Sequence, residues 1–156
     1  MRLLAVALLL AFAAASVSAA DKDEDKAKEV TLAFLKAVKA KDLDAVMKTV
    51  DVPYLNDEKG DFKVIEKVED LKADLKMKLE KIKDTEKIPT EVGEVLDLPA
   101  IRKKVAGKKA EEELKHIEKV LGEKGYVVML GKPDDERGAV LVRIKDGKAK
   151  VVGLPR

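Results

Sequence analysis

Apolar residues recur at helical spacing through the first half of the chain. Residues 27–40 and 43–50 repeat apolar side chains every three or four positions, which predicts two amphipathic helices. Asp42 stands at the position of an N-cap for the second helix, and Pro53 is expected to stop that helix. Leucines form a narrow apolar stripe among charged residues over 68–83, which predicts a third helix.

Shorter elements are expected before and after the third helix. The polar run 56–61 is typical of a turn, and residues 62–66 follow it as a short strand. Residues 86–98 indicate extended structure, in which a proline and a glycine make the strand irregular. Helical spacing returns over 99–121, and Gly107 is expected to break or kink that segment.

The C-terminal residues have the pattern of β-structure. They predict strands at 126–130, 139–145 and 148–154, with a polar loop over 131–138. Asp146-Gly147 separates the last two strands and is a strong signal for a two-residue β-hairpin turn. Helices therefore precede a strand-rich end, which indicates an α+β domain.

The two-residue turn determines which residues face one another across this hairpin. Lys145 is expected opposite Lys148, and Arg143 opposite Lys150. One face is then apolar, while the other carries these four cations with no anion between them, and like charges directly opposite are mildly destabilising. Two interpretations are open: an anion-binding patch, or a solvated edge hairpin whose lysines discourage aggregation. Glutamates from the helices could also neutralise the patch.

The N-terminus has the layout of a secretory signal peptide. Met1-Arg2 is a short positive start, residues 3–15 are an unbroken apolar run, and a polar run begins at Asp21. Small residues before Asp21 fit cleavage after Ala19 or Ala20. A retained membrane anchor is the alternative, because the uncharged stretch is close to the minimum length of a membrane span. We expect cleavage and export, to the periplasm or to the outside of the cell.

Composition excludes several classes of partner and of chemistry. Beyond the signal peptide, residues 1–20, the chain carries 31 basic and 30 acidic side chains, and this balance argues against nucleic acid as a partner. Residues 21–156 are long enough for a single domain. Once the signal peptide is removed, we expect this domain to have no membrane contact. They contain no Ser, Cys, Gln or Trp, which excludes Ser or Cys nucleophiles and disulfides.

Few residues are left to bind a metal or a cofactor. His116 is the one histidine, so a zinc site built from Cys and His ligands is excluded, and we expect His116 at the surface of its helix. The run Asp134-Asp135-Glu136 could meet a cation. It lacks the spaced ligands and the glycine of a calcium loop, which favours an ordinary acidic turn. We therefore predict no metal and no cofactor.

Carboxylates remain as candidates for acid–base chemistry, because burial can raise their pKa into the useful range. Asp61 and Tyr54 flank the first predicted strand, where the mouth of a pocket would lie. A buried Asp beside a Tyr hydroxyl would suit proton abstraction next to a carbonyl group. The alternative interpretation places Asp61 in a solvated turn and Tyr54 at the edge of the core.

Both ends of the chain that follows the signal peptide resemble the NTF2-like superfamily (SnoaL-like, ketosteroid-isomerase-like). Residues 33–46 read AFLKAVKAKDLDAV and are similar to its opening helix pair, and residues 143–150 read RIKDGKAK and are similar to its closing hairpin. The resemblance implies N-terminal helices packed on a curved, mostly antiparallel sheet, often around a conical pocket. The helical segment 99–121 would be an addition to that plan. Dimers through the sheet are common in the superfamily, so a homodimer is an option.

Three functions agree with these observations. The leading hypothesis is an exported, non-catalytic binding or interaction domain whose partner is an unknown small molecule or protein. The alternatives are a small carboxylate-based isomerase, dehydratase or hydrolase of the ketosteroid-isomerase-like kind, and a structural envelope protein. An open pocket that holds Asp61, Tyr54 or another carboxylate would favour an enzyme. A space closed by apolar side chains would direct attention to the outer surfaces, first to the cationic hairpin.

Overall fold

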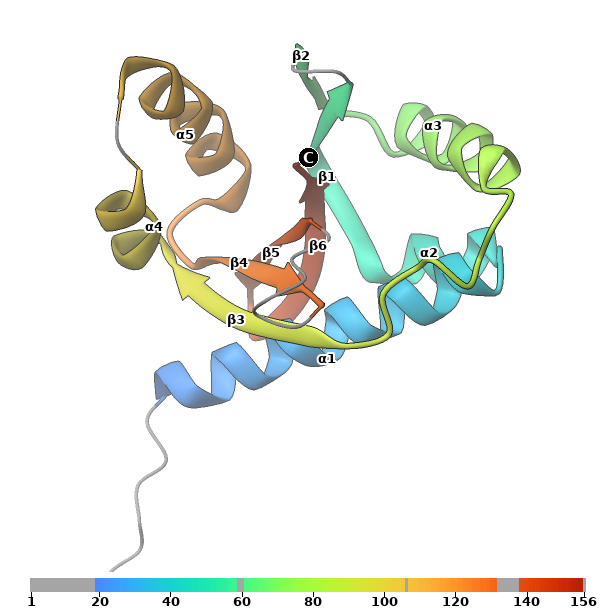
Figure 1. Ribbon diagram of the computed structural model, residues 1–156, viewed down its shortest axis with the longest axis horizontal. Coiled ribbons are helices and arrows are strands. Elements are labelled where there is room, and N and C mark those ends of the chain that lie inside the picture. Colours follow the sequence, from blue (N-terminus) through green and yellow to red (C-terminus); the bar gives the residue numbers. More distant parts are fainter. Residues whose placement is uncertain (1–18, 59–60, 106, 132–137, 156) are drawn as a thin grey trace, which may run out of the picture.

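The structure, a computed structural model, describes residues 19–58, 61–105, 107–131 and 138–155. Residues 1–18 of the predicted signal peptide and the run Asp134-Asp135-Glu136 lie outside these ranges. Within them, Figure 1 shows helices α1 (Ala19–Lys39), α2 (Leu43–Thr49), α3 (Val68–Lys81), α4 (Leu98–Lys104) and α5 (Lys108–Leu121). The strands are β1 (Val50–Glu58), β2 (Asp61–Ile65), β3 (Val92–Asp97), β4 (Gly125–Leu130), β5 (Ala139–Lys145) and β6 (Lys148–Leu154).

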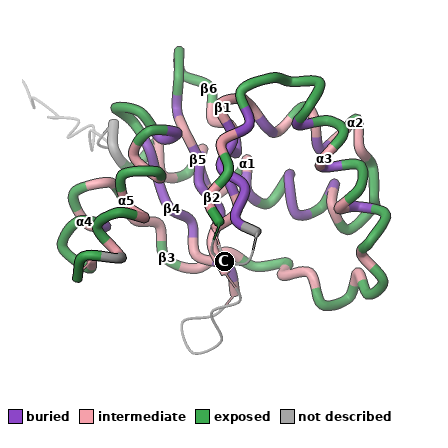
Figure 2. Tube along the Cα trace, turned by 90° about the horizontal axis from the view of Figure 1, so that it is seen from above, coloured by how far each residue is buried: buried purple, intermediate pink, exposed green. Residues whose placement is uncertain are grey.

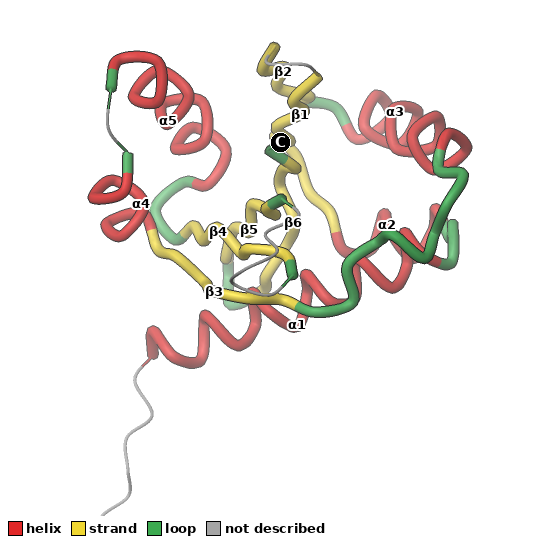
Figure 3. Tube along the Cα trace, in the orientation of Figure 1, coloured by secondary structure: helices red, strands yellow, loops and turns green. Residues whose placement is uncertain are grey.

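The strands form one six-stranded sheet in the order β2-β1-β6-β5-β4-β3. β1 and β6 pair in parallel, whereas the other neighbouring strands pair antiparallel. α1, α2 and α3 pack against one face of the sheet, and α4 and α5 pack against the other (Figures 1 and 3). The predicted α+β fold, with helices on a mostly antiparallel sheet, is confirmed. The predicted helical segment 99–121 is present as α4 and α5.

Alternation along the strands divides the core into two clusters. Val140, Val142 and Val151 pack with α1, α2 and α3, whereas Leu141 and Val152 pack with α4 and α5. Successive residues of a strand point to opposite faces, so each layer of helices receives its own apolar surface. Figure 2 shows buried positions along the strands and exposed positions on the outer sides of the helices. α5 therefore covers the part of the predicted cationic face that lies away from the hairpin turn.

The first two helices differ from the prediction at their ends. α1 begins at Ala19, before the expected start at residue 27, and already includes the charged run that follows Ala20. Acidic residues such as Asp21 are favourable in the first turn of a helix, so the polar run forms the start of the helix rather than preceding it. The predicted N-cap of α2 is confirmed, because the Asp42 carboxylate accepts a hydrogen bond from the Ala45 N–H at 3.0 Å.

The prediction of a helix up to Pro53 is wrong, and the turn predicted over 56–61 is wrong at residues 56–58, which belong to a strand. Residues 59–60 of that predicted turn lie outside the described ranges. α2 ends at Thr49, and the chain continues directly into β1, which pairs with β6 from the far end of the sequence. Pro53 lies in the irregular part of that ladder, where the register shifts and a residue without an N–H is tolerated. Asn56 and Asp57 are buried strand residues rather than turn residues.

The elements from α3 onwards follow the predictions, with one exception. The extended segment predicted at 86–98 is a strand only over Val92–Asp97, and residues 85–88 form a turn. The leucine stripe of α3, formed by Leu71, Leu75 and Leu79, is buried. Gly107 separates α4 from α5, as expected. Gly122 ends α5 with a φ of 66°, and its N–H donates to the Glu118 carbonyl.

The β5–β6 hairpin has the predicted turn and register. Asp146 and Gly147 have φ values of 51° and 73°, as a two-residue turn of type I′ requires. Lys145 lies opposite Lys148, and Arg143 lies opposite Lys150. The alternating pattern on each side of the turn was therefore sufficient to predict this part of the sheet.

Candidate functional site

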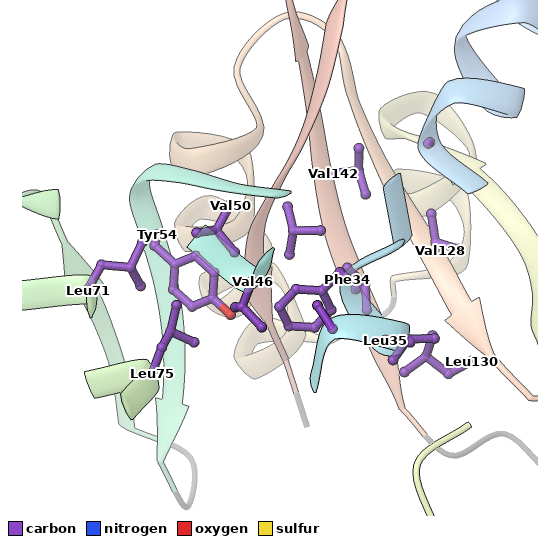
Figure 4. Packing of buried hydrophobic residues seen from close by; sticks show 14 of the residues in the cluster. Phe34, Leu35, Val46, Val50, Tyr54, Leu71, Leu75, Val128, Leu130 and Val142 are labelled. Carbon is purple, nitrogen blue, oxygen red and sulfur yellow. The ribbon is translucent and has the colours of Figure 1, made fainter. Parts of the chain in front are cut away.

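Apolar side chains are packed in the space between the sheet and α1, α2 and α3, where an NTF2-like fold would have its pocket. Figure 4 shows the Tyr54 ring beside Leu71 and Leu75 from α3, with Val46 from α2 and Phe34 from α1 in the same layer. The exposed fraction is 0% for Tyr54 and Val46 and 2% for Phe34. These side chains form a packed core between the sheet and α1, α2 and α3.

Tyr54 and Asp61 are not brought together. In the β1–β2 ladder Tyr54 lies opposite Ile65, whereas Asp61 lies opposite Glu58 at the other end. Asp61 is exposed, and the Tyr54 hydroxyl is buried without a hydrogen bond to any described residue. Burial raises the pKa of Tyr54 well above its ordinary value, and the negative charge of Asp74 raises it further. The phenol therefore stays neutral, and no described carboxylate accepts its proton.

A polar cluster between β1 and α3 was not predicted from the sequence. Asn56 is 3% exposed, and its Nδ2 donates a hydrogen bond to Asp74 Oδ1 at 3.4 Å. Lys78 Nζ donates to Asn56 Oδ1 and lies 3.0 Å from Asp74 Oδ2. The i, i+4 spacing of Asp74 and Lys78 indicates their pairing, but no local signal brings in Asn56. The cluster joins α3 to the sheet and has a structural role.

A cleft of about 240 Å³ lies beside the β5–β6 hairpin, and we name it the hairpin cleft. Four cations and two carboxylates line it: Asp51, Arg143, Lys145, Asp146, Lys148 and Lys150. We refer to Arg143 and Lys150 as the inner cation pair, and to Lys145 and Lys148 as the outer cation pair. The structure thus brings all four predicted anion-binding residues to one cleft.

Arg143 is occupied by structural contacts. Its Nη2 donates hydrogen bonds to Asp51 Oδ2 at 2.8 Å and to the Val52 carbonyl at 2.9 Å, and its Nη1 donates to the Val120 carbonyl at 3.3 Å. A carboxylate from outside the hairpin neutralises this part of the face, because β1 places Asp51 beside the guanidinium group. The sequence had offered glutamates of the helices for this role. The Arg143 side chain is 14% exposed. It holds β1 and the end of α5 against β5.

Lys150 also has a structural contact, whereas the outer cation pair has none. Lys150 Nζ donates to the Lys48 carbonyl in the last turn of α2, where a cation is favourable. Lys145 and Lys148 are both exposed, and neither makes a hydrogen bond or an ion pair with a described residue. The outer cation pair is therefore the part of the hairpin cleft that can bind a ligand.

A larger groove, of about 570 Å³, lies between β2 and α3, and we name it the β2–α3 groove. Its lining mixes charged and apolar side chains: Lys63, Val64, Ile65, Glu66, Lys67, Asp70, Ala73, Asp74 and Met77. Met77 is 53% exposed, and Val68, at the start of α3, is 49% exposed. The outer side of α3 was expected to face solvent, and this groove was not predicted from the sequence.

His116 is exposed on α5, as predicted. Its ring stacks on Phe62 of β2, with the two ring centroids 5.7 Å apart. Within the described ranges, no group of three or more His, Asp or Glu residues could hold a metal ion. In the same part of the chain, no helix has the length and the apolar character needed to cross a membrane.

The fold and the site define a small α+β domain with helices on both faces of a mixed sheet and a cation-lined cleft at a hairpin. No protein-family model and no curated protein matches this sequence. Among solved structures, the chain is similar to one described as an NTF-2 like protein of unknown function from Shewanella oneidensis MR-1, with 15% identity and a TM-score of 0.45. The match covers 84% of this chain and 95% of that chain.

Proposed function

We propose that this protein is an exported, non-catalytic binding domain that holds an anionic group of its partner in the hairpin cleft. The observation that carries the proposal is the outer cation pair. Lys145 and Lys148 lie directly opposite each other, exposed, on the wall of a cleft. Asp146 lines the same cleft but makes no ion pair with either lysine.

Electrostatics favour an anion at this position. Two lysines opposite each other in an antiparallel ladder repel, and no described residue forms an ion pair with either of them. A phosphate, sulfate or carboxylate group between the two ammonium groups replaces that repulsion with charge-assisted hydrogen bonds. A volume of about 240 Å³ suits a small anionic group better than a large apolar ligand. Because both lysines are solvated, the affinity is expected to fall as the salt concentration rises.

The packed interior supports binding at the surface over catalysis in a pocket. Tyr54 is fully buried among apolar side chains, and Asp61 is exposed at the far end of the same ladder. A general base must lie within hydrogen-bond reach of the proton that it removes. The two candidate residues therefore do not form the pair that an isomerase of the ketosteroid-isomerase-like kind would need.

The position of α1 supports the proposed cleavage site. Asp23 lies just after that site, its side chain is 14% exposed, and it forms ion pairs with Lys26 at 3.4 Å and Lys124 at 3.5 Å. Ala27 is fully buried one turn further on. The contacts of α1 with the rest of the domain thus begin within a few residues of Ala20, so cleavage there leaves them intact.

Anion binding is tested by titrating the purified protein with inorganic phosphate or sulfate and following backbone amide shifts by NMR. We expect shifts around Asp146-Gly147 in the wild type and their loss in the double variant Lys145→Glu/Lys148→Glu. The matched control, Lys76→Glu/Lys83→Glu, makes the same charge change at two exposed lysines outside the hairpin and should bind like the wild type. Equal affinity in the wild type and the hairpin variant would reject the proposal.

Export is tested separately by expressing the full chain in a bacterial host. N-terminal sequencing of the protein recovered outside the cytoplasm should begin at Ala20 or Asp21. A protein that begins at Met1 and stays in the cytoplasm would remove export from the proposal. The anion titration does not depend on this result, so the two parts can fail independently.

A further inference from the structure

We propose that a pocket around Tyr126 binds a primary ammonium group carried on a short alkyl chain. The pocket has a volume of about 280 Å³, and we name it the Tyr126 pocket. Three carboxylates, those of Asp23, Asp97 and Glu123, line it together with the tyrosine. It shares no lining residue with the hairpin cleft, so the inference does not rest on the proposed function.

Three segments that are distant in the sequence meet at the Tyr126 pocket. α1 supplies Asp23 near its start, the junction of β3 with α4 supplies Asp97, and the connection from α5 to β4 supplies Glu123 (Figure 1). Asp97 and Tyr126 lie opposite each other in the β3–β4 ladder, and residues directly opposite in such a ladder are side-chain neighbours. The sheet therefore brings one carboxylate to the tyrosine, and the other two segments add theirs.

The Tyr126 hydroxyl has no partner within the described part of the chain. The residue is 8% exposed, and its hydroxyl makes no hydrogen bond with any described residue. Burial raises the pKa of Tyr126, and the negative charges of Asp23, Glu24 and Asp97 raise it further. The hydroxyl therefore lies close to carboxylates and stays neutral. Buried hydroxyl groups are normally hydrogen-bonded, so a bound group that donates to this oxygen would satisfy it.

Two of the three carboxylates keep their charge available for a ligand. Asp23 forms an ion pair with Lys124 at 3.5 Å, and both residues line the pocket. Asp97 accepts a hydrogen bond at Oδ1 from the first turn of α4, which leaves its second oxygen for another donor. Neither Asp97 nor Glu123 forms an ion pair with a described residue. The charge that remains at the pocket therefore favours a cation.

The lining favours a primary ammonium group over a bare charge. Such a group carries three N–H donors, and Asp97, Glu123 and the Tyr126 oxygen offer three acceptors. Leu98 and Pro99 line the same pocket and supply apolar surface for an alkyl chain. The volume suits a chain of a few carbon atoms. A free alkylamine and the lysine side chain of a partner protein both present this chemistry.

NMR titration of the purified protein with n-butylammonium chloride tests the proposal, with the ionic strength held constant by sodium chloride. We expect saturable shifts of the backbone amides of Gly125 and Tyr126. 1-Butanol, which carries a hydroxyl in place of the ammonium group, should cause no such shifts. Nα-acetyl-lysine amide distinguishes the two sources: equal affinity identifies a lysine side chain as the occupant, and weaker binding identifies a free amine. Both results support an ammonium site.

Carboxylate-to-amide variants locate the site. Asp97→Asn/Glu123→Gln removes both available charges and should raise the dissociation constant of n-butylammonium by about tenfold. Asn is as good an N-cap as Asp, and Glu123 is exposed, so this variant is expected to fold. Asp44→Asn/Glu80→Gln makes the same changes at exposed positions outside the pocket and should bind like the wild type. Tyr126→Phe removes one acceptor and should raise the constant by about threefold.

Three results would overturn the proposal. Shifts that do not saturate, or that 1-butanol reproduces, would show that no ammonium site exists. Equal affinity in the wild type and in Asp97→Asn/Glu123→Gln would place the site elsewhere. Equal losses in this variant and in Asp44→Asn/Glu80→Gln would reduce the effect to the net charge of the protein. If the double variant does not fold, Glu123→Gln alone decides, because it changes only an exposed side chain.

Discussion

The inner and outer cation pairs of the β5–β6 hairpin lie two residues apart along each strand and have different roles. Arg143 binds the Asp51 carboxylate and two backbone carbonyls, and Lys150 binds a carbonyl at the end of α2. Lys145 and Lys148 contact solvent. The pairs share their charge and their face of the hairpin. The pairs differ in their neighbours: β1, α2 and α5 lie close enough to the inner pair to accept its hydrogen bonds, and they do not extend to the outer pair.

The largest expected effect is on the inner pair. Arg143→Ala should lower the free energy of unfolding by about 2–3 kcal/mol, because a carboxylate and two carbonyls lose a charged donor. The double variant Lys145→Ala/Lys148→Ala is the matched control and should change that free energy by less than about 0.5 kcal/mol. Urea unfolding measures both values. Equal losses in the two variants would contradict the division into two pairs.

Tyr54 contrasts with Arg143, because its hydroxyl is buried and has no hydrogen bond with any described residue. Burial, and secondarily Asp74, raises the pKa of Tyr54 in the folded state, while the unfolded chain ionises at the ordinary value of 10.0. The folded state then keeps a proton that the unfolded state loses, so stability is complete below pH 10.0 and falls above it, by about 1.4 kcal/mol per pH unit.

Urea unfolding between pH 9 and pH 11 tests this prediction, with Tyr54→Phe as the comparison. The variant should show a shallower alkaline loss. Part of the loss should remain, because burial and nearby carboxylates also raise the pKa of Tyr126. Removing the unpaired hydroxyl should leave the stability at neutral pH unchanged or slightly higher, in contrast to Arg143→Ala. Identical pH profiles would show that Tyr54 is accessible to water.

Lys150 is the other member of the inner pair, and Lys150→Ala should have an intermediate effect on the free energy of unfolding. The substitution removes the donor to the Lys48 carbonyl and a cation at the C-terminal end of α2, which should cost about 0.5 kcal/mol. Lys148→Ala, on the same strand, is the control and should cost less. Thermal unfolding at low and high salt checks the assignment, because the helix-end contribution is screened by salt.

The smallest effect on stability is expected at the outer pair. Lys148→Glu places a carboxylate opposite Lys145 and should raise the free energy of unfolding by about 0.2–0.5 kcal/mol. The same substitution should abolish phosphate binding in the hairpin cleft. A variant that gains stability and still binds phosphate would show that the anion binds outside the hairpin cleft.

Local patterns predicted much of the fold but not the first strand. The leucine stripe of α3 and the break at Gly107 are visible within short windows of sequence, and both were found as expected. β1 was missed because helical spacing continues through Val50, and because one of its two partners, β6, lies about one hundred residues away. Pairing with β6 on one side and with β2 on the other makes residues 50–58 a strand.

Some residues of the candidate site were likewise predicted from local patterns, and others were not. All four cations of the hairpin cleft were predicted, because a two-residue turn and strict alternation place them on one face. Asp51 was not, because it belongs to the strand that was missed. The Asn56–Asp74–Lys78 cluster was missed for a related reason, since Asn56 was assigned to a turn and is a buried residue of β1.

The sequence by itself determined that Lys145 faces Lys148 and Arg143 faces Lys150, because both pairings follow from a turn and a period of two within a dozen residues. Only the tertiary structure decided which of these cations bind the protein and which remain free. That decision depends on β1, α2 and α5, which are held beside the hairpin by apolar packing between distant segments. The spacing of apolar residues shows which face of an element is buried. Because apolar packing is not directional, it does not show which distant segment will cover that face.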